Sequence, residues 1–281
     1  MYEVLIESVI VLFPDRTRPS YQAHRLGAPH PSAPLGQREP STSSLNKQAL
    51  RFRALEPVPV SVLSLLLGLA RMRFNSDILE KVARYYGDKI SRFGPTALGV
   101  DWNKAEYQET RFAQFLRLFP QDRRFSLLDY GCGYGAFYEY LKARGFRAEY
   151  FGCDISEAQI AAGQSKFGDQ TDFHVQVASL PTEPRDFAIA SGIMNVKLDI
   201  DAKLWTKYVL QCIGLLDSVS TRGFAFNMKS SLSDSEYQKE FIHYADPCAM
   251  FEHCARCYSR NLSLLHDYDL YDFTILVFKT P

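Results

Sequence analysis

The chain has 281 residues, 46% of them hydrophobic, and its 32 Lys and Arg residues balance its 32 Asp and Glu residues. This length suits one large domain or two small ones, with enough apolar side chains for a substantial core. A zero net charge without a long basic run argues against a nucleic-acid-binding surface.

The first 71 residues differ in composition from the rest. They contain eight of the 14 prolines, and residues 14–46 form a long polar stretch rich in Pro, Ser, Arg and Gly. Because such a stretch buries little apolar surface, we expect 1–71 to be a disordered extension and 72–281 to be the folded domain. Two apolar pieces, 2–13 and 58–70, are too short to span a membrane. A peripheral anchor through 58–70 is the alternative.

Two amphipathic helices are predicted next. The first covers residues 77–86, begins after a cap at Asn75 or Ser76, and ends or bends at Gly87. The second covers residues 104–119, where apolar side chains recur at helical spacing. Helices therefore precede the first predicted strand.

A glycine-rich loop follows that first strand, which covers residues 125–128 and ends at Asp129. A helix is predicted over residues 136–144 after the loop. The loop has glycines at alternate positions: Gly131, Gly133 and Gly135. Strand, glycine loop and helix form the first unit of nucleotide-type α/β folds. The glycines permit a tight turn and let a ligand approach the backbone.

This loop departs from the dinucleotide fingerprint G-x-G-x-x-G, because Ala136 stands where the third glycine is needed. The carboxylate of Asp129 would also repel a pyrophosphate, whereas it suits a ligand that carries an ammonium group. Both features argue against an oxidoreductase that binds a nicotinamide dinucleotide. A glycine-rich turn that binds nothing is the remaining alternative.

The stretch D-x-G-x-G-x-G resembles the first motif of class I S-adenosylmethionine (SAM) methyltransferases. The resemblance covers about residues 76–279. It implies a Rossmann-like α/β fold with a seven-stranded sheet, mostly parallel with a C-terminal antiparallel hairpin, and helices on both faces. It implies that residues 72–120 form a helical lid. It also places the amino-acid end of SAM against a group of loop residues: Asp129, Gly131, Cys132, Gly133 and Gly135.

A second strand, residues 150–153, ends in Asp154 and Ile155. Asp154 lies 25 positions after Asp129, which is about one βαβ spacing. An acid at this strand tip commonly holds ribose hydroxyls, because a carboxylate accepts two hydrogen bonds from a diol. The alternative is that Asp154 or Ser156 caps the helix that begins near Glu157.

The third and fourth strands carry weaker signals. After the third strand, 173–177, the family usually places a polar group on the adenine, and Gln176 is one of two nearby polar side chains. The backbone of Val177 and Ala178 could serve instead. The fourth strand ends at Ser191, near the transferred methyl group in the implied fold, and Asn195 could orient a substrate.

The remaining predicted elements complete the implied sheet. Their ranges are a helix 202–216, a strand 223–227, a polar insertion 228–247, a helix 247–258, and a pair of antiparallel strands 261–265 and 271–278.

Candidates for the chemistry lie on polar loops and in the predicted lid. A catalytic base is needed only if the acceptor is a poorly ionised hydroxyl, and the candidates are His243, Asp246 and His266. The candidates for substrate contact are Tyr85, Tyr86, Trp102, Arg111, Asn195 and Tyr244. Core aromatic residues, a surface arginine and surface or capping residues are the ordinary roles of these side chains.

The six cysteines include one C-x-x-C pair, Cys254 and Cys257, beside His253 and downstream of Cys248. A zinc site is conceivable from these residue types. The helical spacing of Cys254 with neighbouring aromatic residues instead favours a buried thiol and no metal. A reduced, cytoplasmic protein is the simpler interpretation.

The sequence therefore predicts an enzyme that transfers a methyl group from SAM to a small-molecule acceptor. The resemblance extends to hydroxyl, carboxylate, sugar and secondary-metabolite acceptors and does not choose among them. The alternative is a protein that binds SAM or a related nucleoside without turnover. We expect no nucleic-acid partner and no integral membrane segment.

Overall fold

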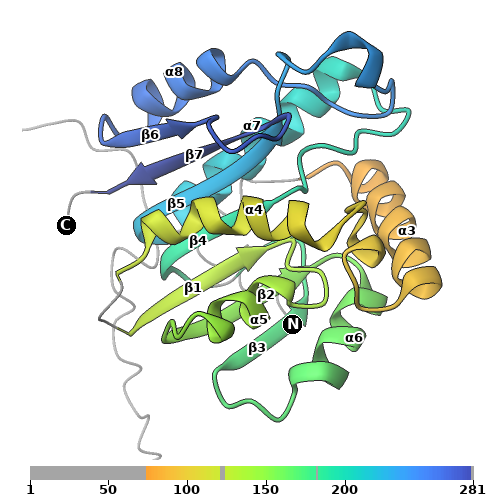
Figure 1. The fold of residues 1–281 in the computed structure, drawn as a ribbon, viewed down its shortest axis with the longest axis vertical. Helices are drawn as coiled ribbons and strands as arrows, with labels where there is room; N and C mark the ends of the chain where they lie inside the picture. Colours follow the sequence, from red (N-terminus) through yellow and green to blue (C-terminus); the bar gives the residue numbers. More distant parts are fainter. Residues whose placement is uncertain (1–73, 121–123, 182, 280–281) are drawn as a thin grey trace, which may run out of the picture. The chain divides into compact units, whose positions relative to one another are not determined.

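The computed structural model describes residues 74–120, 124–181 and 183–279. Their strands form one seven-stranded sheet in the order β3-β2-β1-β4-β5-β7-β6 (Figure 1). Neighbouring strands among β1 to β5 pair in parallel. β7 runs antiparallel to both β5 and β6. The predicted Rossmann-like sheet with a C-terminal antiparallel hairpin is confirmed.

Each predicted strand is present in the structure, with small shifts in its ends. The strands are β1 Phe125–Tyr130, β2 Ala148–Asp154, β3 Phe173–Val177, β4 Arg185–Ser191, β5 Ser220–Lys229, β6 Leu262–Leu265 and β7 Asp272–Phe278. β1 continues past its predicted end, so that Asp129 lies inside the strand, opposite Gly152 of β2 and Ile189 of β4. This places the carboxylate of Asp129 within the sheet and not in the glycine loop.

The helices also follow the predicted order. The α-helices are α3 Ser76–Phe93, α4 Ala105–Phe115, α5 Ala136–Ala143, α6 Glu157–Phe167, α7 Ala202–Ser218 and α8 Pro247–Cys257. Three short 3₁₀ helices are η1 Leu98–Val100, η2 Leu116–Leu118 and η3 Ser235–Tyr237. The predicted helix 104–119 is therefore α4 followed directly by η2.

The sequence predicts that Gly87 ends or bends the first helix, and the first of these two possibilities is wrong. α3 continues to Phe93, because Ile90 extends its buried face by a further turn. Gly94 ends the helix with a φ of 64°, and its N–H donates to the Ile90 carbonyl at 2.8 Å. Of the two predicted caps, Asn75 is the one that accepts hydrogen bonds from the first turn. Burial of Ile90 thus outweighs the helix cost of Gly87, which is about 1 kcal/mol.

Helices cover both faces of the sheet, as predicted. On one face, side chains of α4, α5 and α6 pack over Leu127 and Ile189. On the other face, side chains of α7 and α8 pack over Leu128 and Phe226. Figure 1 shows α4 and α5 on one side of the sheet and α7 on the other. Alternate residues of a strand therefore enter different cores, as expected for a sheet buried on both faces.

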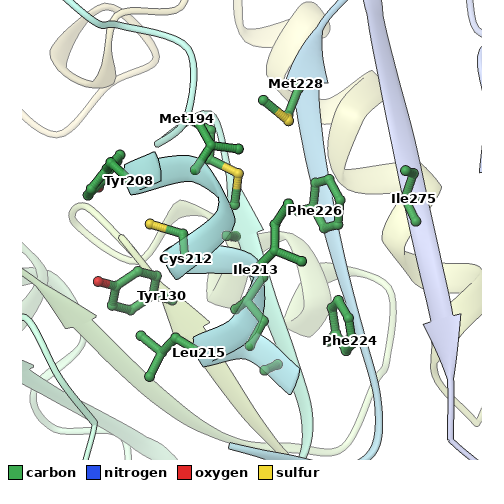
Figure 2. Close-up of a cluster of buried hydrophobic side chains, with 14 of the residues drawn as sticks. Tyr130, Met194, Tyr208, Cys212, Ile213, Leu215, Phe224, Phe226, Met228 and Ile275 are labelled. Atoms are coloured by element: carbon green, nitrogen blue, oxygen red, sulfur yellow. The ribbon is translucent and has the colours of Figure 1, made fainter. Parts of the chain in front are cut away.

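α7 supplies much of the second of these cores. Figure 2 shows Ile213 reaching from α7 toward Phe226 of β5, while Cys212 reaches toward Tyr130 of β1. Trp205, at the start of α7, is fully buried and donates its indole N–H to the Met194 carbonyl at 2.9 Å. This packing fixes the segment that follows β4, which contributes to the site described below.

The predicted extension, residues 1–71, and its possible anchor lie outside the described residues, so both remain predictions. Within the described ranges, no helix has the length and apolar character of a membrane span. The same ranges contain no group of three or more His, Cys, Asp or Glu side chains placed to bind a metal ion. Cys254 is buried in α8, whereas Cys248 and Cys257 are exposed.

Candidate active site

The glycine loop between β1 and α5 requires glycine for two reasons. Gly131, Gly133 and Gly135 all have positive φ values, of 78°, 55° and 87°. A Cβ atom at Gly131 would lie 2.1 Å from Cγ2 of Ile193, and one at Gly135 would lie 2.8 Å from the Phe173 ring. A Cβ atom at Gly133 would lie 3.0 Å from Val100. Both the backbone conformation and the space above it therefore exclude side chains.

Asp129 is a buried carboxylate beside this loop, with 3% of its surface exposed. Its Oδ2 atom accepts a hydrogen bond from the Tyr150 hydroxyl at 2.6 Å. Burial raises the pKa of Asp129 to about 7, against the lowering effect of the Tyr150 hydrogen bond, and the nearby Asp154 raises it further. A cation placed beside Asp129 would stabilise its ionised form, which agrees with the predicted partner, an ammonium group.

Asp154, at the tip of β2, holds the glycine loop through a hydrogen bond. Its Oδ2 atom accepts from the Gly133 N–H at 2.9 Å, and its Oδ1 atom accepts from the Ser156 N–H at 2.8 Å. Burial raises the pKa of Asp154, while these backbone hydrogen bonds lower it. The helix cap is Ser156, whose hydroxyl accepts from the Gln159 N–H at 3.4 Å. Of the two residues weighed as caps, Asp154 is therefore not the one that caps α6.

A cavity, which we call the first cavity, opens above these residues. Most of the predicted cofactor residues line it: Asp129, Gly131, Cys132, Gly133, Asp154, Ile155 and Ser191. Gly135 does not line it and instead precedes α5 as its N-cap residue. Gln176 and Val177 are exposed on β3 and do not line it either, whereas Ala178 does. A contact of Gln176 or Val177 with a ligand remains a prediction.

Gln159 of α6 lines the first cavity as well, although no sequence pattern indicates a role for it. It is 1% exposed, and its Nε2 atom donates to the Gly99 carbonyl at 2.9 Å and the Tyr86 carbonyl at 3.4 Å. Its Oε1 atom is buried and has no hydrogen-bond partner among the described residues. A buried acceptor without a partner is costly, so this atom marks a place where a donor from a ligand would be stabilised.

Elements of the predicted lid close over this cavity. Tyr86 of α3, Val100 of η1 and Trp102 line it. Asp101 holds the turn after η1 against α3, since it accepts from the Tyr85 hydroxyl at 2.6 Å and pairs with Lys89 at 2.5 Å. The segment 98–102 is thereby attached to α3. Whether it opens as a lid remains a prediction.

A second cavity adjoins the first. The two share four lining residues: Asp101, Trp102, Lys229 and Ile242. Of the predicted substrate residues, Tyr86 and Asn195 line the first cavity only, Tyr85, Arg111 and Tyr244 line the second only, and Trp102 lines both. The structure therefore brings all six of these candidates to one of two adjoining cavities.

Arg111 is not a surface arginine. It is 3% exposed and forms an ion pair with the buried Asp272 at 2.5 Å. Its guanidinium lies 4.1 Å from the centre of the Trp102 ring. Lys229 approaches the same Asp272 oxygen at 2.9 Å. Arg111 and Asp272 lie 161 positions apart, so no local pattern could have paired them.

The three candidates for a catalytic base have different surroundings. Asp246 caps α8 through the N–H groups of Cys248 and Ala249. His243 lines neither cavity, and burial together with the charge of Lys197 lowers its pKa. Only His266 lines a cavity, the second one, where it is exposed. None of these observations tests a catalytic role.

Asn195 has a structural role that the sequence did not indicate. Its Oδ1 atom accepts from the Lys229 N–H at 2.8 Å, and its carbonyl accepts from the His243 N–H at 2.7 Å. It thus ties the segment after β4 to the end of β5 and to the segment before α8. The Oδ1 atom of this side chain therefore helps to hold the wall of the first cavity, and a contact of Asn195 with a substrate remains a prediction.

Known proteins resemble this chain in sequence or in fold. A protein-family model described as "Methyltransferase domain" matches residues 79–276. "Putative methyltransferase Rv1506c" of Mycobacterium tuberculosis (strain ATCC 25618 / H37Rv) is 42% identical over 155 residues, which are 55% of this chain and 93% of that protein. The solved structures named "DhpI-SAH complex structure" and "DhpI-SAM-HEP complex" each give a TM-score of 0.51 at 13% identity, over 74% of this chain and 100% of the other. At that identity the two structures show a shared fold alone.

Proposed function

We propose that this chain, which belongs to the methyltransferase-domain family, uses SAM to methylate a small molecule held in the second cavity. The observation that carries the proposal is the wall common to the two cavities, formed by Asp101, Trp102, Lys229 and Ile242. A methyl donor in one cavity and an acceptor in the other would meet at this wall.

The residues of the first cavity fit SAM. Asp129 offers a buried carboxylate for its ammonium group, and the unpartnered Oε1 atom of Gln159 offers a further acceptor. Gly133 leaves the loop open on the cavity side, where a side chain would stand in the way. Asp154 at the tip of β2 would receive the ribose hydroxyls, in competition with the backbone N–H groups that now donate to it. When bound, SAM would supply a methyl group made electrophilic by its sulfonium.

The main work of the chain in such a reaction is positioning. Holding two reactants in a near-attack arrangement removes roughly 7–11 kcal/mol from a barrier. Trp102 is well placed for this, because its ring packs on Gly192, directly after β4, and the guanidinium of Arg111 also lies against the ring. The ring would keep water from the junction of the cavities while leaving the acceptor in contact with it.

Proton transfer matters less to such a reaction than the positioning of the two reactants. A sulfonium leaves as a neutral thioether, so the leaving group needs no acid. An ionised carboxylate acceptor needs no base, whereas a hydroxyl acceptor does. His266 is the candidate base that lines the second cavity.

The experiment that tests this function follows the methyl group. The full chain is incubated with methyl-labelled SAM and a cell extract separated into small-molecule, protein and nucleic-acid fractions. Label entering the small-molecule fraction is the expected result. Label confined to protein or nucleic acid would contradict the small-molecule acceptor. SAM binding without transfer to any fraction would favour the alternative of a SAM-binding protein without turnover.

A further inference from the structure

Exposed aromatic side chains gather around the second cavity. In the part of the chain that the structure describes, five aromatic residues rank among the exposed large hydrophobic side chains. Four of them line this cavity: Tyr107, Tyr237, Phe241 and Tyr271. The fifth is Phe93, which lines neither cavity. Aromatic surface left open to solvent around a single cavity suggests a ligand that presents apolar faces to these rings.

The charges of the same cavity balance. Four cationic side chains line it, Lys89, Arg111, Lys229 and Lys239, together with four carboxylates, Asp101, Asp267, Asp269 and Asp272. A site for a phosphate or a polycarboxylate would need an excess of cations. A site for a purely apolar molecule would not surround it with carboxylates that must be desolvated.

Some of these charged side chains already form ion pairs with one another. Asp101 pairs with Lys89, and Asp272 pairs with both Arg111 and Lys229. Asp267 and Asp269 form no ion pair or side-chain hydrogen bond with other described residues, and both are exposed in the loop between β6 and β7. Each ionised carboxylate can accept several hydrogen bonds, and two neighbouring hydroxyls are a suitable donor pair for it.

Several tyrosine side chains that line this cavity are held by contacts within the protein. Tyr237 and Tyr271 lie with ring centres 5.9 Å apart and planes inclined by 31°. The Tyr271 hydroxyl donates to Asp234, and the Tyr244 hydroxyl accepts from the Lys239 N–H at 3.0 Å. Rings fixed before binding lose less conformational entropy when a ligand packs on them.

We propose that the acceptor is a neutral carbohydrate, bound in the second cavity with its ring faces against Tyr237 and Tyr271 and its hydroxyls on Asp267 and Asp269. A sugar ring combines apolar C–H faces with a rim of hydroxyls, which matches exposed aromatic residues beside unpaired carboxylates. This inference rests on the proposed function and narrows its acceptor from small molecules in general to one class.

The reaction at a sugar hydroxyl is balanced. The hydroxyl oxygen forms a bond to the methyl carbon, the bond from that carbon to sulfur breaks, and the electron pair of the broken bond stays on sulfur as a thioether. The hydroxyl proton passes to the imidazole of His266, which lines the same cavity. No oxidant or further reactant is needed.

The test is an array of neutral and anionic glycans probed with the labelled full chain in the presence of S-adenosylhomocysteine (SAH). Binding to neutral glycans, with methylation of the bound glycan when SAM replaces SAH, is the expected result. Preference for phosphorylated or carboxylated glycans overturns the inference. Binding to no glycan by a protein that still binds SAH also overturns it, while the proposed function stands. Failure of the wild-type chain to bind SAH would overturn the proposed function itself.

Variants of Tyr237 test the ring contact. Tyr237 is 60% exposed, so Tyr237→Ala should fold normally. We expect it to weaken glycan binding about 3- to 10-fold, as the loss of one aromatic contact predicts. Tyr237→Phe keeps the ring and should retain the affinity, and Phe93→Ala is the matched control outside the cavity. SAH affinity should stay constant in all three. Unchanged glycan affinity in Tyr237→Ala would contradict the proposed contact.

Discussion

The two cavities share a wall but differ in how the chain builds them. The first is built around the end of β1, the glycine loop from Gly131 to Gly135 and the tip of β2, and side chains of α3, α4, α6 and α7 complete its lining. The second combines side chains from α3, α4, the segment after β5 and the loop between β6 and β7. The part of the first cavity beside the glycine loop is therefore fixed largely by local backbone conformation, whereas the second cavity depends throughout on the packing of distant segments.

The cavities differ in charge as well. The first contains Asp129 and Asp154, two carboxylates whose pKa values are raised by burial. The second has balanced charges, three of its carboxylate–cation contacts being made within the protein. A pair of desolvated carboxylates favours a cationic ligand, and a balanced set favours a neutral one. A substitution in the first cavity should therefore change the affinity for SAM and leave the affinity for the acceptor nearly unchanged, and a substitution in the second cavity should do the reverse.

Gly133→Val should have the largest effect on the first cavity. Its Cβ atom would enter the space between the glycine loop and Val100, and we expect SAM affinity to fall at least about 100-fold. The matched control is Gly145→Val, because Gly145 has a φ of 76° and nothing within 4 Å of an added Cβ. Calorimetry of folded variants would measure both affinities. Equal losses in the two would mean that backbone strain, and not the cavity, explains the effect.

Asp154→Ala should have the next largest effect on the first cavity. Losing two ribose hydrogen bonds to a carboxylate, each about 1.5–3 kcal/mol and partly replaced by water, predicts about 10- to 1000-fold weaker binding of SAM and of SAH alike. The structure adds a cost in stability, since Asp154 also accepts from the N–H groups of Gly133 and Ser156. Melting temperature and both affinities would be measured on the same variant. A loss of SAM affinity with unchanged SAH affinity would contradict the ribose contact.

Arg111→Ala acts on the other side of the shared wall. Removing one member of a buried ion pair costs about 3–5 kcal/mol of stability, and we expect about 3 kcal/mol here because Lys229 still partners Asp272. SAM affinity should change less than about threefold, since Arg111 does not line the first cavity.

Arg144→Ala is the matched surface control for that variant. Arg144 also pairs with a carboxylate and lies over an aromatic ring, but its side chain is 39% exposed. Its loss should cost at most about 1 kcal/mol. Urea unfolding would compare the two variants, and equal costs would contradict the assignment of Arg111 to a buried ion pair.

The smallest effect expected is a dependence of SAM affinity on pH. Burial raises the pKa of Asp129 to about 7, so this carboxyl takes up a proton as the pH falls below 7. If the ionised form holds the ammonium group, affinity should fall about fivefold between pH 7 and pH 6. Asp129→Asn should bind weakly with a flatter profile, and the remaining slope would report Asp154. An unchanged slope in Asp129→Asn would contradict the role of Asp129.

Much of the first cavity could be predicted because its signals are local. An apolar run, an acid and three spaced glycines within eleven residues define a strand and a turn whatever lies elsewhere. Gln159 could not be predicted, because its importance depends on carbonyls of Gly99 and Tyr86 that only the packing of α3 on α6 brings close. The length of α3 was underestimated for a similar reason, since the burial of Ile90 is a tertiary contact.

The second cavity was predicted only as separate candidates. Tyr85, Trp102, Arg111, Tyr244 and His266 were singled out by residue type, without a pattern that placed them together. Asp272 and Tyr237, which also line this cavity, could not be singled out, because the residues that they contact, such as Arg111 and Tyr271, lie far from them in the sequence. No short stretch of the sequence predicts the second cavity, because its lining residues come from several segments that are far apart in the chain.

The most direct test of the account is a crystal structure of the full chain with SAH. We expect the ribose of SAH to lie at Asp154 and its amino-acid end to lie beside Asp129 and Gln159. We expect its sulfur to point toward the wall that the two cavities share, formed by Asp101, Trp102, Lys229 and Ile242. This arrangement would place a transferred methyl group at the mouth of the second cavity. SAH bound outside the first cavity, or bound there with its sulfur directed away from this wall, would contradict the account.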